Sequence, residues 1–253
     1  MLPSAINVIR DGLLALAYPE ECRVCGGAVE SWDDGVACAE CWNNPAFTTI
    51  LTGTVCHKCG ASLAPATGSP SQTLPPRICG MCSSSPYSSL RSCGIYSGAL
   101  EASILSLKIA PHICPRLRSI ICRTYSDHDR ALGSDLVIPV PLHRLRESQR
   151  GFNQAELVAQ LIAREFSVQL DDRSLKRIKP TERHRAGMDA NDRARSVKGA
   201  FAVVRPRVIE GASVLLVDDL YTTGSTIGAA SQALLQAGAS RVNVLTIARV
   251  GDR

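Results

Sequence analysis

The hydrophobic positions of this chain follow two different patterns before and after about residue 90. In the first part, closely spaced cysteines are separated by stretches rich in Ser, Pro and Gly, over residues 61–76 and 83–89, which are typical of loops. In the second part, apolar runs alternate between the spacing of strands and that of helices. We therefore predict a cysteine-rich domain over residues 1–90 and an α/β domain over residues 91–253.

The apolar runs of the second part predict strands and helices in alternation. Strands are predicted over 93–96, 136–140, 214–217 and 242–247, and helices over 99–109 and 225–237. The run 214–217 is apolar throughout and bounded by acidic residues, as in a central parallel strand. Strand, helix and strand in this order predict right-handed crossovers and a parallel sheet flanked by helices.

A further helix is predicted from Asn153 onward. Asn153 can cap its first turn, and Glu156 follows three residues later, as in a capping box. Leu157, Leu161 and Ile162 are predicted to form its apolar face.

Eleven cysteines change the picture of the first part, because eight of them form four CxxC pairs within 82 residues. Two thiolates separated by two residues reach one tetrahedral ion from a single turn, and two such turns complete a four-sulfur shell. The eight therefore predict two structural Zn²⁺ sites, with interleaved pairing as an open alternative. The predicted ligands are Cys22, Cys25, Cys38, Cys41, Cys56, Cys59, Cys79 and Cys82.

The start of the chain and the lengths of its apolar runs bear on the cell compartment, and so on the state of the cysteines. Residues 2–17 carry Arg10 and Asp11, so they predict an amphipathic helix and not a signal peptide. No apolar run approaches the roughly 20 residues that span a bilayer. We therefore expect a reducing cytoplasm, where paired cysteines hold metal more often than disulfides. Cys93, Cys114 and Cys122 lack motif spacing and are predicted to be inert thiols, and His57 a spacer.

Charge is unevenly divided along the chain, whose formal net charge is +5. Residues 1–100 hold five Lys/Arg against seven Asp/Glu, and the remainder holds 23 against 16. Two zinc sites with four thiolates each would add about −4 to the first part. This disfavours phosphate-driven nucleic-acid binding by the cysteine-rich part and favours a structural or protein-docking module.

The sharpest chemical signal is the segment VLLVDDLYTTGST, residues 214–226. An apolar strand ends in Asp218 and Asp219, whose carboxylates can accept hydrogen bonds from ribose hydroxyls or bind hydrated Mg²⁺. Residues 222–226, the predicted phosphate loop, open a helix, and their amide and hydroxyl groups suit a phosphate monoester. A Walker-type NTPase is the alternative, but the chain contains no G-x-x-x-x-G-K-[ST].

This segment resembles the PRPP-binding motif of type I phosphoribosyltransferases, and nearly the whole chain resembles the ComF family. The segments DLVIPVPLHRL and RGFNQ, within residues 135–154, and the cysteine-rich start are similar to those of that family. The resemblance implies a phosphoribosyltransferase-like parallel sheet flanked by helices, preceded by a double zinc ribbon, with a hood over the site.

The resemblance also implies roles for single residues. Asp218 and Asp219 would hold the ribose hydroxyls. Thr222, Thr223, Gly224, Ser225 and Thr226 would bind the 5-phosphate. Val140, Pro141, Leu142, His143 and Arg144 would face pyrophosphate, although a proline-stiffened strand exit is the alternative. Arg150 would bind phosphate or be a solvated charge at a helix start.

The hood would be residues 173–198, which contain nine Lys/Arg and three Asp/Glu. Here the chain departs from the family pattern, with His184 where Gln is common and Ser196 where Asn is common. The implied activity is Mg²⁺-dependent transfer of the phosphoribosyl group of PRPP to a nucleobase or amine, with release of pyrophosphate. The alternative is a competence factor that senses PRPP or a nucleotide, or binds single-stranded DNA or a protein of the competence machinery.

Overall fold

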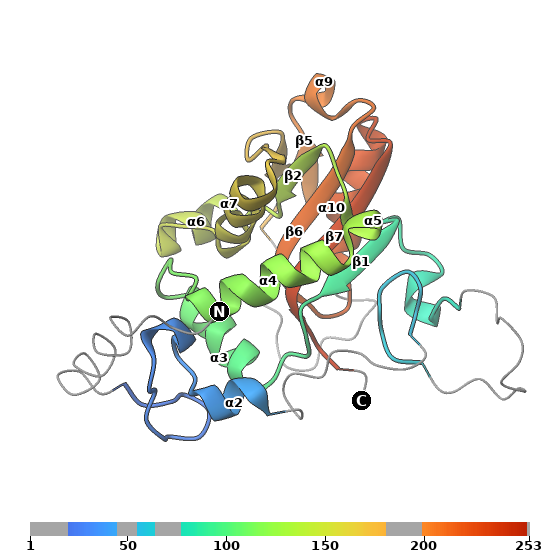
Figure 1. The fold of residues 1–253 in the computed structure, drawn as a ribbon. Coiled ribbons are helices and arrows are strands. Elements are labelled where there is room, and N and C mark those ends of the chain that lie inside the picture. The colour runs from blue at the N-terminus through green and yellow to red at the C-terminus, as the bar shows by residue number, and fades with distance from the viewer. Residues whose placement is uncertain (1–19, 45–54, 64–76, 181–198, 252–253) are drawn as a thin grey trace, which may run out of the picture.

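A computed structural model of the chain describes residues 20–44, 55–63, 77–180 and 199–251. Its centre is a five-stranded sheet in the order β1-β7-β6-β2-β3, in which all neighbouring strands are parallel (Figure 1). The strands are β1 (Ser89–Ser92), β2 (Leu136–Pro139), β3 (Gln169–Leu170), β6 (Ser213–Tyr221) and β7 (Arg241–Arg249). The predicted fold class, a parallel sheet flanked by helices, is confirmed.

Strand β6 lies at the centre of the sheet, and its residues 214–217 are apolar on both faces. Val214 and Leu216 of β6 contact one core cluster, whereas Leu215 and Val217 contact the other, and all four are fully buried. A strand buried on both sides must be apolar throughout, which is the pattern that the run 214–217 predicted.

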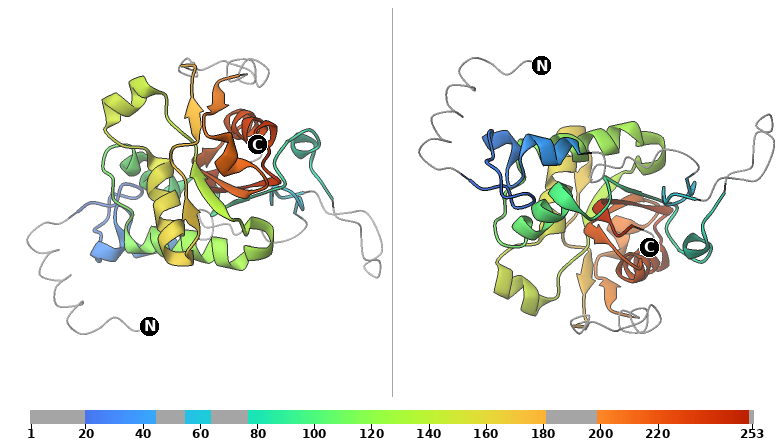
Figure 2. Two further views of the ribbon diagram at one scale, coloured as in Figure 1. Left: turned by 90° about the horizontal axis from the view of Figure 1, so that it is seen from above. Right: turned by 90° about the horizontal axis from the view of Figure 1, so that it is seen from below.

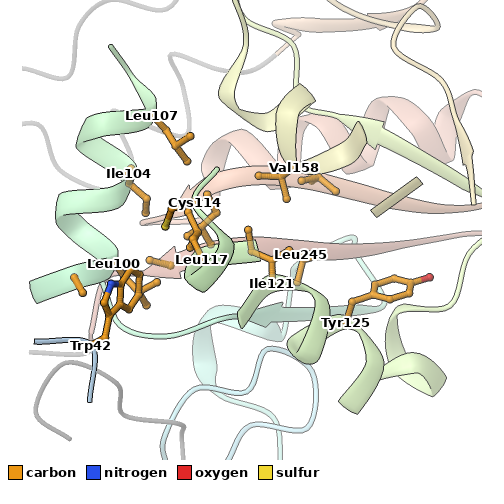
Figure 3. Close-up of a cluster of buried hydrophobic side chains, with 14 of the residues drawn as sticks. Trp42, Leu100, Ile104, Leu107, Cys114, Leu117, Ile121, Tyr125, Val158 and Leu245 are labelled. Atoms are coloured by element: carbon orange, nitrogen blue, oxygen red, sulfur yellow. The ribbon is translucent and has the colours of Figure 1, made fainter. Parts of the chain in front are cut away.

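Helices cover both faces of the sheet. One face carries α3 (Gly98–Leu107), α4 (Pro115–Asp127) and α7 (Gln154–Phe166). Figure 3 shows Ile104 of α3, Ile121 of α4 and Leu245 of β7 among the buried side chains of this core. The other face carries α10 (Ser225–Gln236), and Figure 2 shows it on the side of the sheet away from α4.

A two-stranded antiparallel ribbon lies on the α10 face. It pairs β4 (Leu175–Arg177) with β5 (Phe201–Val203), and Leu175 and Phe201 are buried in the same core as α10. The short helical elements are η1 (Trp32–Asp34), α2 (Ala39–Asn43), η2 (Gly80–Cys82), α5 (Asp129–Leu132), α6 (Arg144–Arg150) and α9 (Pro206–Ile209). No helix in the described ranges is both long and apolar enough to cross a membrane.

The first predicted strand was placed too late in the sequence. The strand is Ser89–Ser92. Residues 93–96 are not part of a strand, and within them Ile95 forms an isolated β-bridge with Arg249. Polar pairs explain the error, because Ser89 Oγ donates to Asn243 Oδ1 at 3.2 Å and the hydroxyls of Ser92 and Thr246 lie 2.7 Å apart. A short strand in which only Leu90 is apolar, and which polar cross-strand pairs help to hold, has a weak hydrophobic pattern.

Helix α7 has the predicted cap and packs its predicted apolar residues against the core, but its buried face is wider than predicted. Asn153 caps it by accepting a hydrogen bond from the Ala155 amide at 3.1 Å, but Glu156 accepts from Gln160 and does not complete the predicted box. The fully buried side chains are Ala155, Val158, Ala159 and Ile162, whereas Leu157 and Leu161 are half-buried.

The cysteine-rich part packs directly on the α/β part. Trp42 is buried against α3 and α4, and the cysteines at 56, 59 and 82 are buried on the α10 face with Tyr87 and Leu90. The division into domains at residue 90 stays a prediction, and that position lies inside β1. The predicted helix over 2–17 and most of the predicted hood, including His184 and Ser196, lie outside the described residues.

Candidate functional site

The carboxyl end of β6 carries the two predicted site carboxylates. Both Asp218 and Asp219 lie within the strand, which continues to Tyr221. Burial raises the pKa of Asp218 well above its usual range, the charge of Asp219 raises it further, and Arg177 opposes the shift. Two carboxyl groups held together in this way are suited to hydrogen-bond donors or to a cation.

The predicted phosphate loop joins this strand to α10. Gly224 is the N-cap of α10 with φ of 74°, a left-handed conformation that favours glycine. Glycine has no side chain to cap the helix, so it leaves the first-turn amide groups available to a ligand. The hydroxyls of Thr223 and Ser225 lie 2.9 Å apart beside these amide groups. The arrangement suits a phosphate group.

The predicted pyrophosphate loop, residues 140–144, leaves the sheet at the same edge. Strand β2 pairs with β6 up to Pro139 and Val217, and the Val140 amide donates to the Val217 carbonyl at 2.8 Å. The side-chain amide of Asn153 donates to the Val140 carbonyl at 3.0 Å and ties the loop to the start of α7. Residues 140–144 therefore start beside Asp218.

The residues that end this loop have local roles as well. His143 caps α6, with Nδ1 accepting from the Leu145 amide at 3.4 Å, and Arg144 is already the first residue of that helix. Arg150 is the last residue of α6 and not a helix-start residue, and its guanidinium donates to Gln154 Oε1 at 2.8 Å.

A cavity of about 340 Å³ separates the pyrophosphate loop from β4. Residues 141–144 line it from one side, and Lys176 and Arg177 line it from the other. The guanidinium of Arg177 lies 5.3 Å from the ring centre of Phe201. Burial lowers the pKa of Arg177, as does Arg146, whereas Asp218 raises it. Tertiary structure thus brings described cations of the predicted hood to the edge that carries Asp218.

The other residues around this cavity and the β6 end were not predicted. Glu147, Glu156 and Asp172 also line the cavity, and burial together with the other two carboxylates raises the pKa of Glu156. Near the end of β6, burial raises the pKa of Tyr96, and the charges of Glu101 and Asp219 raise it further. These residues lie outside the quoted motifs, so spacing along the chain gave no signal for them.

Eight cysteines form two groups of four in the order of the sequence. The first cluster is Cys22, Cys25, Cys38 and Cys41, and the second cluster is Cys56, Cys59, Cys79 and Cys82. In each cluster the four Sγ atoms lie within 4.8 Å of one another. The predicted ligands are thus brought together without interleaving, and His57 belongs to neither cluster.

Backbone amide groups prepare both clusters for a cation. The Cys38 amide donates to Cys22 Sγ at 3.2 Å, and the Cys79 amide donates to Cys56 Sγ at 3.3 Å. Burial raises the pKa of Cys22 and of Cys56, but amide hydrogen bonds outweigh it and bring each to about 6, whereas burial and the neighbouring thiols raise the pKa of Cys41 and of Cys82. The thiolate is the form that binds metal, so the donor sets fit tetrahedral Zn²⁺.

The other three cysteines lie apart from these clusters. Burial raises the pKa of Cys93 to about 12, and it also raises those of Cys114 and Cys122. Thiols in this state are poor nucleophiles, in agreement with the prediction that they are inert.

The fold and the clusters define an α/β protein with a parallel sheet and two four-cysteine sites of the zinc-ribbon type. The sequence profile of the double zinc ribbon domain matches residues 13–83. The DNA utilization protein YhgH of Shigella flexneri is 31% identical over 241 residues, which is 92% of this chain and 99% of that protein. Competence protein F of Haemophilus influenzae is 37% identical over 116 residues, 46% of this chain and half of that protein. The chain belongs to the family of these proteins, the ComF family.

Solved structures add little to this assignment. A glutamine phosphoribosylpyrophosphate amidotransferase from Bacillus subtilis, complexed with ADP and GMP, is 23% identical with a TM-score of 0.32. The match covers 46% of this chain and 23% of that one. A TM-score this low carries no argument about the site.

Proposed function

We propose that this chain is a Mg²⁺-dependent phosphoribosyltransferase that binds PRPP and transfers its phosphoribosyl group to a nucleobase or amine. The observation that carries the proposal is the meeting of three elements at one edge of the sheet. Asp218 and Asp219 lie at the end of β6, the phosphate loop opens α10 without a capping side chain, and residues 140–144 leave β2 beside them. Ligands of open parallel sheets bind at the carboxyl ends of the strands.

Each part of PRPP has a matching group at this edge. The amide groups and hydroxyls of the phosphate loop suit the 5-phosphate, and the carboxylates of Asp218 and Asp219 suit the ribose hydroxyls. The cavity beside residues 140–144, with Arg144, Lys176 and Arg177 in its lining, suits the pyrophosphate.

In the reaction, a lone pair of the acceptor forms a bond to C1 of the ribose. The bond from C1 to the pyrophosphate oxygen breaks, pyrophosphate leaves with the electron pair, and the acceptor loses its proton to solvent. Positive charge on the ribose ring is stabilised by the Asp218 and Asp219 carboxylates, and negative charge on the leaving group by the cations of β4. Bound Mg²⁺ would neutralise pyrophosphate charge, and the paired carboxylates fit it because a cation relieves their repulsion.

A binding role without turnover is the second candidate. It is favoured by the names of the relatives, competence and DNA utilization proteins, which refer to the handling of DNA and not to a transfer reaction. In that case PRPP or a nucleotide would be a signal in DNA uptake or use, and single-stranded DNA or a competence protein would be the partner.

Calorimetric titration of the zinc-loaded protein with PRPP and Mg²⁺ tests the site. We expect saturable binding that the Asp218→Asn/Asp219→Asn variant loses. The Asp33→Asn/Asp127→Asn variant is the matched control, because it makes the same change of charge at exposed positions away from this edge. No binding by folded wild-type protein would contradict the proposal.

A screen for pyrophosphate release over nucleobases and amines then separates the two candidates. Release that depends on one acceptor and is absent in the double aspartate variant supports the transferase. Tight binding with no release across the screen supports the sensor.

A further inference from the structure

The second cysteine cluster lies close to the end of β6 although the two are far apart in sequence. Its Cys56, Cys59 and Cys82 are buried in the same core as Tyr221 and Ile227, on the α10 face of the sheet. The first cluster belongs to the core on the opposite face, with α3 and α4. The two clusters are therefore placed differently with respect to the phosphate loop.

Two tyrosine side chains connect the second cluster to the loop. The Tyr87 hydroxyl lies 3.5 Å from Cys82 Sγ and 3.1 Å from the Tyr221 hydroxyl, and both tyrosines are buried. A metal-bound thiolate only accepts hydrogen bonds. The Tyr87 hydroxyl must then donate to Cys82 Sγ, and its oxygen accepts from the Tyr221 hydroxyl. A metal-bound thiolate thus fixes the direction of both hydrogen bonds.

Tyr221, the last residue of this hydrogen-bonded series, contacts the phosphate loop itself. A Cβ added to Gly224 would lie 2.7 Å from the Tyr221 hydroxyl oxygen and 3.0 Å from two of its ring carbons. The Tyr221 ring therefore packs flush against the main chain of Gly224, the N-cap of α10. A shift of the Tyr221 ring towards the loop must displace Gly224 or the start of α10.

A buried arginine makes a second link between the cluster and β6. The guanidinium of Arg249 donates to the Cys59 carbonyl at 3.1 Å, approaches Cys59 Sγ at 3.6 Å and lies 5.6 Å from the ring centre of Tyr221. Four thiolates and one Zn²⁺ carry a formal charge of about −2, which stabilises a buried guanidinium. Arg249 pairs with Tyr221 in the sheet, so it also holds the strand end.

We propose that the second cysteine cluster supports the phosphate loop, and that Tyr221, held by Tyr87 and Arg249, is the residue that positions it. The proposal rests on the proposed function, because it assigns a support to the site that would bind the 5-phosphate. The cluster acts without touching the ligand. It fixes the Tyr221 ring, and the ring fixes Gly224 and the first turn of α10.

Hydrogen–deuterium exchange of the ligand-free protein tests the coupling independently of PRPP. Tyr87→Phe is the decisive variant, because it removes the hydroxyl between Cys82 and Tyr221 and leaves every contact of the loop itself in place. We expect the amides of residues 228–231, which form the first hydrogen bonds of α10 beginning with Gly228 to the Gly224 carbonyl at 2.7 Å, to exchange about fivefold faster, the factor for one buried hydrogen bond. Tyr125→Phe is the matched control, since Tyr125 lies in the other core against Phe166.

Metal removal gives a second arm. Cys79→Ser, which breaks the second cluster, is expected to raise exchange of residues 228–231 at least as much as Tyr87→Phe does. Cys25→Ser, which breaks the first cluster, is expected to leave exchange of these residues at the wild-type rate. Metal content and circular dichroism confirm that each cysteine variant has lost one metal and kept its fold.

Affinity for PRPP completes the test. We expect Tyr87→Phe to weaken binding by about the same factor of five, with Tyr125→Phe unchanged. Exchange of residues 228–231 at the wild-type rate in both Tyr87→Phe and Cys79→Ser would overturn the proposal, whatever the PRPP affinity. Accelerated exchange together with no PRPP binding by the wild type would keep the coupling and refute the proposed function.

Discussion

Replacement of Gly224 by alanine tests the close contact between the phosphate loop and the Tyr221 ring. The added Cβ meets two separate penalties. The backbone has φ of 74°, and a left-handed conformation costs an alanine about 1–2 kcal/mol. The Cβ also lies 2.7 Å from the Tyr221 hydroxyl oxygen, and overpacking of a well-packed core costs about 1–3 kcal/mol.

A matched variant removes the backbone penalty from the comparison. Gly211 has φ of 75° and nothing within 4 Å of an added Cβ, so Gly211→Ala carries the first cost alone. We therefore expect Gly224→Ala to lose about 1–3 kcal/mol more unfolding free energy than Gly211→Ala. In thermal unfolding this difference corresponds to roughly 2–12 °C of Tm for a chain of this size.

The assay is denaturant and thermal unfolding of zinc-loaded protein, with both variants also made in a Tyr221→Leu background. In the Tyr221→Leu background, Gly224→Ala should lose only as much unfolding free energy as Gly211→Ala does, because the ring that the added Cβ would contact is gone. Equal destabilisation by the two glycine variants in the wild-type background would refute the close approach of Tyr221 to the loop.

Two further predictions concern the carboxylates and the metal. Burial and Asp219 raise the pKa of Asp218 above its usual 3.8, so the folded state binds the proton more tightly and stability falls as pH rises. Asp218→Asn should therefore stabilise ligand-free, zinc-loaded protein without Mg²⁺, by a margin that widens in denaturant unfolding as the pH rises above the usual pKa; a margin that narrows contradicts this. Metal analysis should find two zinc ions per chain and one in Cys25→Ser or Cys79→Ser; one zinc in the wild type would contradict the two-site arrangement.

Local patterns were sufficient for the strongest elements of the sheet. The run 214–217 is apolar and buried on both faces, and the helix after it begins at Ser225 and ends before Gly238, as its pattern predicted. These signals are local because burial on both faces requires continuous hydrophobicity, and because helix ends need particular residues. The CxxC spacing is local in the same sense, since each turn presents two sulfurs to one point.

Where tertiary contacts compensate for local polarity, the sequence was less informative. Strand β1 is held by hydroxyl pairs to β7, so its hydrophobic pattern is weak and the strand was predicted several residues too late. The predicted face of α7 was incomplete: Ile162 is buried and Leu157 and Leu161 pack against the same core, but Val158 and Ala159, which are fully buried, were not predicted. Side-chain size alone does not decide which stripe of a helix meets its neighbour.

The sequence by itself determined the chemistry available to this protein, namely two sets of four thiolates, a carboxylate pair at a strand end and a small-residue loop that opens a helix. Only the tertiary structure decided which of these groups act together. Tyr87 and Tyr221 are 134 positions apart, and Arg249 lies 190 positions from Cys59. Parallel strand order and register bring them into contact, and such long-range geometry depends on the packing of the whole sheet, which no local spacing encodes.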